Sequence, residues 1–306
     1  MHSSSILRFA RPTLARANFF GRRTPKQSVI RKLKNGDVIL ARRAPEASTA
    51  TGTNAGLVIV PGLNLPASAY EPLMLSLQKT AATQGINLYL GCINFDWYDE
   101  APWNPDVLHE RVDGVAASFA RHGFRAEQPI FHAAHSLSTT FLQDYLQGGR
   151  KTAGQILLGG CLLRKYHSPF TYRVPTLTVG AQFDGEEPIM RQAEQHLVHK
   201  DLDQTLFPFV VLEGQTHMQF ASGKRPAHMK EELPPMVDDV TAHRSISDIS
   251  VDFMKSRLGL PDSGLVLKKQ LERTSTNLLP FLLAQDNALI SHSLQGGKGP
   301  TLFYAH

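Results

Sequence analysis

A serine, an aspartate and a histidine, whose side chains often act together in catalysis, each follow an apolar run in this chain. Ser136 lies in AAHSLS, Asp184 in TLTVGAQFDG and His217 in FVVLEGQTH. A serine hydroxyl is a weak nucleophile at neutral pH, and a neutral imidazole beside it can accept its proton during attack. A carboxylate bonded to that imidazole fixes its tautomer and stabilises the imidazolium that forms. These residue types therefore predict acyl transfer to a serine.

The placement of the three residues supports their acting together. Each lies just past the C-terminal end of a predicted strand, and open α/β sheets place their sites at that end. The chain order Ser–acid–His is also one of the orders known for serine hydrolases. We therefore expect Ser136, Asp184 and His217 to be the catalytic residues.

Ser136 is expected on a tight turn between a strand and a helix, where the flanking residues must be small. Ala134 and Ser138 stand where the usual G-x-S-x-G form has glycine, so the motif is weakened although its steric requirement is met. A helix N-cap is the alternative role for such a serine. His135 is expected to point away from Ser136 and to be structural.

Asp184 and His217 also have alternative interpretations. Asp184 precedes a glycine, and Asp-Gly is a common turn pair. Glu186 and Glu187 are possible replacement acids, although their position suggests the start of a helix, where acids interact favourably with the dipole. His217 is one of 13 histidines and could lie on a surface loop.

Two backbone amides are expected to stabilise the oxyanion that forms on the substrate carbonyl. One belongs to Leu137, directly after the predicted nucleophile, and the other to Leu63, after the first buried strand. Asn64 could assist or replace Leu63.

The elements that must position these residues alternate along the chain. Asn35-Gly36 between two short β-favourable runs predicts a hairpin. Apolar runs then alternate with helical stretches, which predicts an α/β fold with a mostly parallel central sheet, helices on both faces and an N-terminal antiparallel hairpin. The expected strands cover 57–62, 87–95, 130–135, 155–163, 176–181 and 209–213, with 46–56 as a loop. The last helix is expected around Ile246, Ile249 and Phe253.

Over about residues 28–258 the chain resembles the α/β-hydrolase fold superfamily. The resemblance is carried by a strand followed by Pro61-Gly62, then AHSLS, then G-x-x-x-D-G and then E-G-x-x-H in this order. It is closest to the dienelactone hydrolase, chlorophyllase and lipase-like branches, many of which carry His-Gly where this chain has Pro61-Gly62. The resemblance implies a serine hydrolase that forms an acyl-enzyme.

The expected substrate is a small-molecule carboxylic ester, of a hydrophobic or lipid-like kind. This expectation rests on two aromatic segments, since ligand sites are mostly apolar. Packing of a cap segment explains the same aromatics equally well. A thioesterase or amide hydrolase with the same residues is an alternative, and so is a non-catalytic binding protein, which the missing glycines favour slightly. The aromatic residues are Trp97, Tyr98, Trp103, Tyr166, Phe170 and Tyr172.

The charge of the chain is concentrated at one end. The 306 residues carry 32 Lys and Arg against 27 Asp and Glu, a net charge of +5, and residues 1–36 contain no acid. An Arg-rich, acid-poor, amphipathic leader is typical of an organelle transit peptide. We therefore expect a mitochondrial transit peptide over 1–24, with a plastid or cytoplasmic location as alternatives. The catalytic domain is expected at 25–258 and a C-terminal appendage at 259–306.

Several other function classes lack support in the sequence. No phosphate-binding glycine loop, dinucleotide fingerprint or zinc-ligand spacing occurs, so neither a cofactor nor a metal is expected. Nucleic-acid binding would rest on the basic leader alone. No apolar run reaches the roughly 18 residues that a membrane-spanning helix needs. The two cysteines cannot form a disulfide framework.

Overall fold

The computed structural model describes residues 29–41, 52–95, 103–167, 172–199 and 201–294. The predicted leader over 1–24 lies outside these residues, as do the aromatic residues at 97, 98 and 170. No helix in the described part of the chain is both long enough and apolar enough to cross a bilayer.

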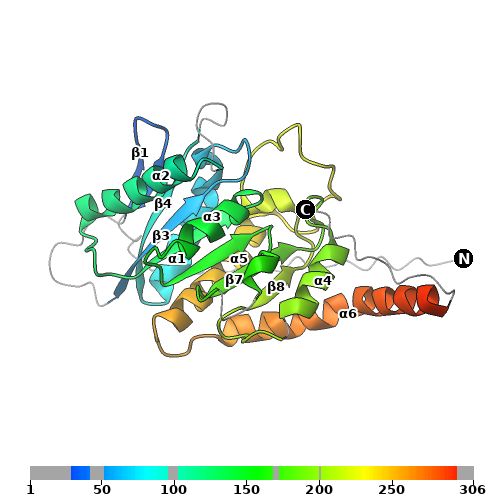
Figure 1. The fold of residues 1–306 in the computed structure, drawn as a ribbon. Coiled ribbons are helices and arrows are strands. Elements are labelled where there is room, and N and C mark those ends of the chain that lie inside the picture. The colour runs from blue at the N-terminus through cyan, green and yellow to red at the C-terminus, as the bar shows by residue number, and fades with distance from the viewer. Residues whose placement is uncertain (1–28, 42–51, 96–102, 168–171, 200, 295–306) are drawn as a thin grey trace, which may run out of the picture.

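The strands form one eight-stranded sheet in the order β1-β2-β4-β3-β5-β6-β7-β8 (Figure 1). β1 and β2 form the antiparallel hairpin expected around Asn35-Gly36, β2 pairs antiparallel with β4, and the remaining pairs are parallel. The predicted fold class is therefore confirmed. The strands are β1 (Val29–Lys32), β2 (Val38–Ala41), β3 (Thr53–Val60), β4 (Ile86–Cys92), β5 (Ile130–His135), β6 (Gly154–Leu158), β7 (Thr176–Ala181) and β8 (Phe209–Leu212).

Helices cover both faces of the sheet because its central strands are apolar on both sides. In β3, Leu57 and Ile59 pack under α1 and α5, whereas Val58 and Val60 pack under α2 and α3. The helices are α1 (Glu71–Thr83), α2 (Pro105–Ser118), α3 (Ser138–Gln147), α4 (Ile189–His199), α5 (Asp239–Arg257) and α6 (Leu265–Leu294). Short 3₁₀ helices add η1 (Ala67–Tyr70), η2 (Phe119–His122), η3 (Arg164–Tyr166) and η4 (His217–Phe220).

Several strand boundaries differ from those expected, most of all the start of β3, the end of β4 at Cys92 and the end of β6. β3 begins at Thr53, inside the stretch predicted as a loop, and pairs with β4 from that residue on. Its small residues have a packing reason, because a Cβ on Gly56 would lie 3.2 Å from the rings of Phe119 and Phe124. β6 ends at Leu158 because Gly159 turns the chain with a φ of +58°.

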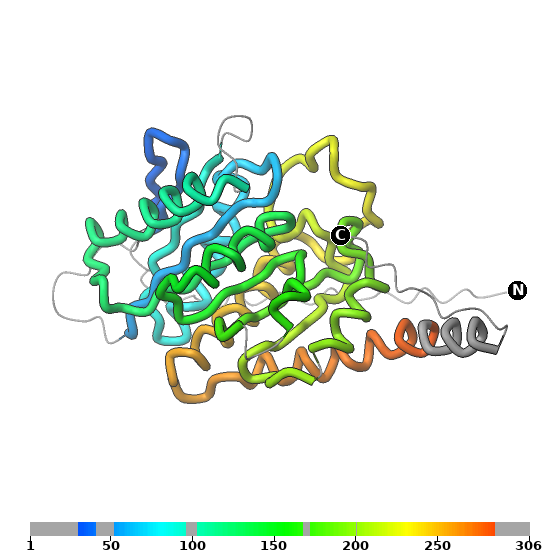
Figure 2. The backbone as a smooth tube through the Cα atoms, in the orientation of Figure 1, coloured from blue at the N-terminus to red at the C-terminus, as the bar shows by residue number. Residues whose placement is uncertain are grey.

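The prediction that the helix around Ile246 is the last one was wrong, because α6 follows it. The carboxylate of Asp252 in α5 accepts hydrogen bonds from the amides of Gly264 and Leu267, where α6 begins. α6 then runs along the edge of the sheet beside β8 and α4 (Figure 2). Pro280 lies inside this helix, and the sequence showed no sign of a helix there because proline disfavours a helix interior.

α6 supplies hydrogen-bond partners to the free edge of β8. The hydroxyl of Thr274 accepts from the amide of Val211 at 2.9 Å, and the side-chain amide of Gln270 donates to the Val211 carbonyl at 2.9 Å. Side chains of α6 therefore satisfy two backbone groups of β8 that would otherwise pair with a ninth strand.

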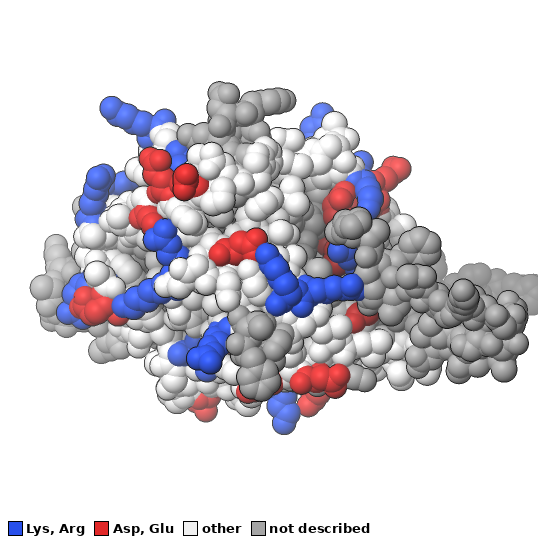
Figure 3. All heavy atoms as spheres, in the orientation of Figure 1, with Lys and Arg blue, Asp and Glu red and all other residues white. Residues whose placement is uncertain are grey.

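Acidic and basic side chains are interspersed over the face of the molecule seen in Figure 3. On this face the described residues present no large area of a single charge.

Candidate active site

Ser136 lies on the turn between β5 and α3 with a φ of +57°. This left-handed conformation is rare for a residue other than glycine and costs about 1–3 kcal/mol. The Ser136 amide donates to the carbonyl of Leu158 at 2.8 Å, which helps to hold the turn. The turn thus presents the half-buried Ser136 side chain at the C-terminal edge of the parallel strands.

The two small residues that flank this turn are buried, as close backbone packing requires. Ala134 is fully buried, and so is Ser138, whose hydroxyl donates to the Pro61 carbonyl at 2.5 Å. Ser138 therefore ties the turn to the end of β3, a contact that glycine could not make.

Asp184 and His217 meet from the loops after β7 and β8. Nδ1 of His217 lies 2.8 Å from Oδ2 of Asp184, and both side chains are fully buried. The other carboxylate oxygen, Oδ1, accepts from the amides of Glu186 at 2.8 Å and Glu187 at 2.7 Å. These bonds fix the carboxylate, and because it only accepts, Nδ1 of His217 carries the proton.

Nε2 of His217 is therefore left as the proton acceptor of the ring. It is buried and has no hydrogen-bond partner among the residues that the structure describes. His217 and Ser136 line the same cavity, but no hydrogen bond joins Ser136 Oγ to His217 Nε2 in this structure. Catalytic hydrogen bonds of this kind often form only when substrate is bound.

The pKa of His217 is raised above its usual value by its surroundings. Burial lowers this pKa, but the hydrogen bond and charge of Asp184 raise it, as do the charges of Glu232 and Glu186. The imidazolium form that a general base must pass through is thus stabilised within the site.

His135 bonds to Tyr70 and not to Ser136. The buried Tyr70 hydroxyl accepts from the Gly62 amide at 2.7 Å and lies 2.7 Å from Nδ1 of His135. Burial, and then the neighbouring His217, hold the pKa of His135 well below its usual value. The His135 ring is therefore neutral and its Nδ1 accepts from Tyr70. Its centroid lies 4.6 Å from that of His217, so the Tyr70–His135 pair supports one side of the site.

Leu63 and Leu137, the expected oxyanion donors, both line the cavity that contains Ser136. Within the described residues neither backbone amide donates a hydrogen bond. Asn64 has a φ of +57°, and its exposed side chain lies 3.4 Å from Nδ1 of His228. The two leucine amides are therefore available to a developing oxyanion.

Glu186 and Glu187, the possible replacement acids, precede α4 and contact Asp184 through their backbone amides. The Glu187 carboxylate instead pairs with Arg191 at 3.1 Å. Neither carboxylate makes the contact with His217 that Asp184 makes.

The cavity has a volume of about 200 Å³ and a largely apolar lining. Two of its lining residues, His228 and Met229, belong to the segment 221–238 between η4 and α5, here called the arch. The arch has no regular periodicity, and the sequence did not reveal its part in the site. The cavity is lined by Gly62, Leu63, Leu65, His135, Ser136, Leu137, Glu186, His217, His228 and Met229.

None of the described members of the expected aromatic pocket lines this cavity. Tyr166 and Tyr172 stack on each other at 4.4 Å and pack with Leu162 and Phe207 in a separate cluster. Trp103 has half of its surface exposed, at 51%. Tyr166 and Tyr172 are thus buried members of that cluster and do not line the cavity.

Among the described residues, no group of three His, Cys, Asp or Glu side chains is arranged to hold a metal ion. Both cysteines, Cys92 and Cys161, are free.

The chain matches no protein-family model and no curated protein. Among solved structures it is similar to a predicted CIB-like hydrolase from Thermoplasma acidophilum, with a TM-score of 0.45, 13% identity, and coverage of 75% of this chain and 97% of that one. It is also similar to an alpha-beta serine hydrolase homologue from Coxiella burnetii, with a TM-score of 0.42, 16% identity, and coverage of 65% and 92%.

Proposed function

We propose that this protein is a serine hydrolase that cleaves a carboxylic ester through an acyl-enzyme. One observation carries the proposal. His217, bonded through Nδ1 to a buried Asp184 and with Nε2 unpartnered, lines the same cavity as Ser136 on its strained turn.

Each residue then has a defined role. Ser136 Oγ attacks the ester carbonyl while its proton passes to Nε2 of His217, and Asp184 stabilises the resulting imidazolium. The Leu63 and Leu137 amides stabilise the oxyanion. The alcohol leaves with the proton from His217, and a water activated by the same imidazole then hydrolyses the acyl-enzyme.

The cavity favours a small apolar acyl group. Its volume of about 200 Å³ is small, because sites for drug-sized ligands occupy roughly 300–1,000 Å³. Its apolar lining comes from Leu63, Leu65, Leu137 and Met229. We therefore propose a short-chain ester in place of the lipid-like ester expected from the aromatic segments.

Covalent labelling by a fluorophosphonate probe tests the proposal, because the probe reacts with an activated serine. The full-length protein should be labelled, and Ser136→Ala and His217→Ala should abolish labelling. Ser245→Ala, which changes a half-buried serine on α5 that does not line the cavity, should leave it unchanged. Absence of labelling in the wild type would refute the enzyme, and labelling that persists in Ser136→Ala would refute the site.

The acyl specificity needs a separate measurement. Along p-nitrophenyl acetate, butyrate, octanoate and palmitate, kcat/KM should fall once the acyl chain outgrows the cavity. Met229→Ala, which shortens a side chain that lines the cavity, should move the optimum to a longer chain. A rise towards palmitate in the wild type would contradict the short-chain assignment.

We also propose that residues 1–24 direct the protein to mitochondria, on the basis of their arginine-rich, acid-free composition. A fluorescent fusion of residues 1–30 should enter mitochondria. Accumulation in plastids or a diffuse cytosolic signal would contradict the proposal.

A further inference from the structure

The arch is attached to both loops that carry the proposed catalytic dyad, and Glu232 makes the central contact. One of its carboxylate oxygens, Oε1, accepts from the backbone amide of His217 at 2.7 Å and from that of Gly185 at 3.2 Å. Gly185 directly follows Asp184. A single oxygen atom therefore joins the loop after β7 to the loop after β8.

A second contact runs in the opposite direction. Oε1 of Glu186, on the loop after β7, accepts from the backbone amide of Lys230 in the arch at 2.6 Å. The two segments also touch directly, because a Cβ on Gly185 would lie 3.0 Å from the Glu231 carbonyl oxygen and 3.1 Å from Cγ of Glu232. The arch is thus seated closely on the loop that carries Asp184.

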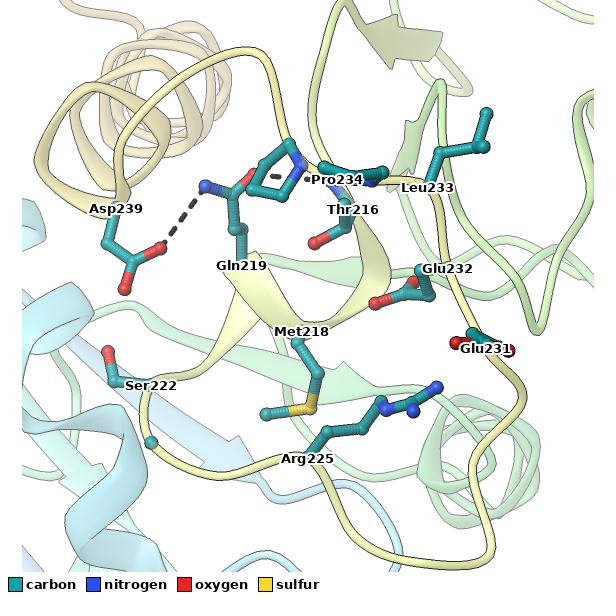
Figure 4. Close-up of a pocket in the computed structure, with 12 residues that line it drawn as sticks. Thr216, Met218, Gln219, Ser222, Arg225, Glu231, Glu232, Leu233, Pro234 and Asp239 are labelled. Carbon is teal, nitrogen blue, oxygen red and sulfur yellow. Dashed lines mark hydrogen bonds between the residues drawn. The ribbon is translucent and has the colours of Figure 1, made fainter.

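Figure 4 shows Glu232 beside Met218, on the wall of a pocket of about 350 Å³ between the arch and η4. The adjacent Glu231 lines the same pocket, but its side chain is exposed and makes no hydrogen bond or ion pair within the described residues. The side chain of Glu232 therefore bonds to the two loops that carry Asp184 and His217, whereas the side chain of the neighbouring Glu231 does not.

We propose that Glu232 is a positioning residue, which sets the spacing of the Asp184 and His217 loops through its two backbone contacts. This inference rests on the proposed function, because it assigns Glu232 a role in holding the general base. The Asp184–His217 bond of 2.8 Å joins loops from two different strands, and their backbones must keep a fixed separation for it to form. Small displacements of catalytic groups reduce rates strongly.

Glu232 also contributes charge to the surroundings of His217. The titratable groups that face this imidazole are Asp184, His135, Glu186, Glu187 and Glu232. Removal of the Glu232 charge leaves the others in place and should lower the pKa of His217. The acidic limb of the kcat/KM profile should then move to lower pH.

The experiment compares alanine and glutamine variants at positions 232 and 231 in the full-length protein, with p-nitrophenyl acetate as substrate. Glu232→Ala removes the acceptor and should lower kcat about 10- to 100-fold with KM unchanged. Glu232→Gln keeps an oxygen acceptor, so it should retain most of kcat while its acidic limb moves to lower pH. Glu231→Ala and Glu231→Gln should match the wild type in both measurements.

Two results would overturn the proposal. One is a kcat of Glu232→Ala within about twofold of that of Glu231→Ala. The other is an acidic limb that Glu232→Gln and Glu231→Gln shift equally. If Glu232→Ala does not fold, the comparison of the two glutamine variants decides the question.

A measurement without turnover separates this inference from the proposed function. The pKa of His217 can be followed by NMR of its ring protons and carbons in the wild type and the glutamine variants. If the wild type is neither labelled by the fluorophosphonate probe nor active on p-nitrophenyl acetate, the proposed function fails. A His217 pKa lowered in Glu232→Gln alone still supports the contact, whereas an equal pKa in both variants refutes it.

Discussion

Replacement of Tyr70 by phenylalanine should destabilise the protein through the loss of one atom. The hydroxyl of Tyr70 is fully buried and bonds to the Gly62 amide and to Nδ1 of His135, each at 2.7 Å. Without this hydroxyl, one donor and one acceptor are left unpaired in the interior. Each such group costs about 1–3 kcal/mol, so Tyr70→Phe should lower the free energy of unfolding by about 2–6 kcal/mol.

Urea denaturation measures this difference if the slope with denaturant stays constant. Tyr89→Phe is the matched control, because the Tyr89 side chain is half-buried and its hydroxyl makes no hydrogen bond within the described residues. It should change stability by less than about 0.5 kcal/mol. The amide of Leu63 follows Gly62, so Tyr70→Phe should also slow acylation.

An unfolding free energy for Tyr70→Phe within about 0.5 kcal/mol of the wild type would refute this reasoning. It would mean that the Gly62 amide and the His135 ring find other partners when the hydroxyl is removed. A loss of stability without any loss of rate would keep the energetic argument but separate Tyr70 from the oxyanion loop.

Three further predictions concern the histidine loop and the sheet edge. Gly159→Ala should lower kcat about 100-fold, because its Cβ would lie 2.8 Å from Nδ1 of His217. Gly149→Ala, also at a positive φ but with no atom within 4 Å of the new Cβ, should cost stability alone, and equal kcat values in the two variants would contradict the crowding. In the pH profile of kcat/KM, the acidic limb should lie above pH 6.5, because protonated His217 cannot accept the Ser136 proton. Its pKa is raised although burial opposes this. An acidic limb at or below pH 6.5 would argue against His217 as the base. Thr274→Val should lower the unfolding free energy by about 1–3 kcal/mol, because it leaves the Val211 amide unpaired. Thr276→Val changes an exposed residue of the same helix and should have no effect in the same urea titration.

The strands were predictable where both of their faces are buried. The runs over 130–135 and 176–181 coincide with β5 and β7, because continuous apolar sequence is what a doubly covered parallel strand requires. The start of β3 was not predictable, since Thr53 and the small residues after it give no apolar signal. Their strand conformation comes from pairing with β4 and from the aromatic rings above Gly56.

The candidate site was predictable to the extent that its residues follow strand ends. Asp184 and His217 are brought together by parallel strands that deliver their loops to the same edge, and strand position selected His217 from among the other histidines. Glu232 and Met229 could not be found this way, because an irregular segment carries them. The contacts of Glu232 are made to backbone amides, which have no signature in the sequence. The described aromatic residues, Trp103, Tyr166 and Tyr172, do not line the cavity, because composition does not reveal which surface a ring packs against.

The cover that α6 provides over β8 also bears on how copies of this chain can associate. An uncovered edge strand presents amides and carbonyls that invite pairing with another chain, which can lead to open-ended aggregation. Here the polar groups of Val211 are already bonded to Thr274 and Gln270, so a second copy could add a strand only by displacing α6. The opposite edge, β1, is four residues long and includes two basic residues, Arg31 and Lys32, a further known obstacle to pairing. α6 thus opposes the addition of a strand from another copy at the β8 edge.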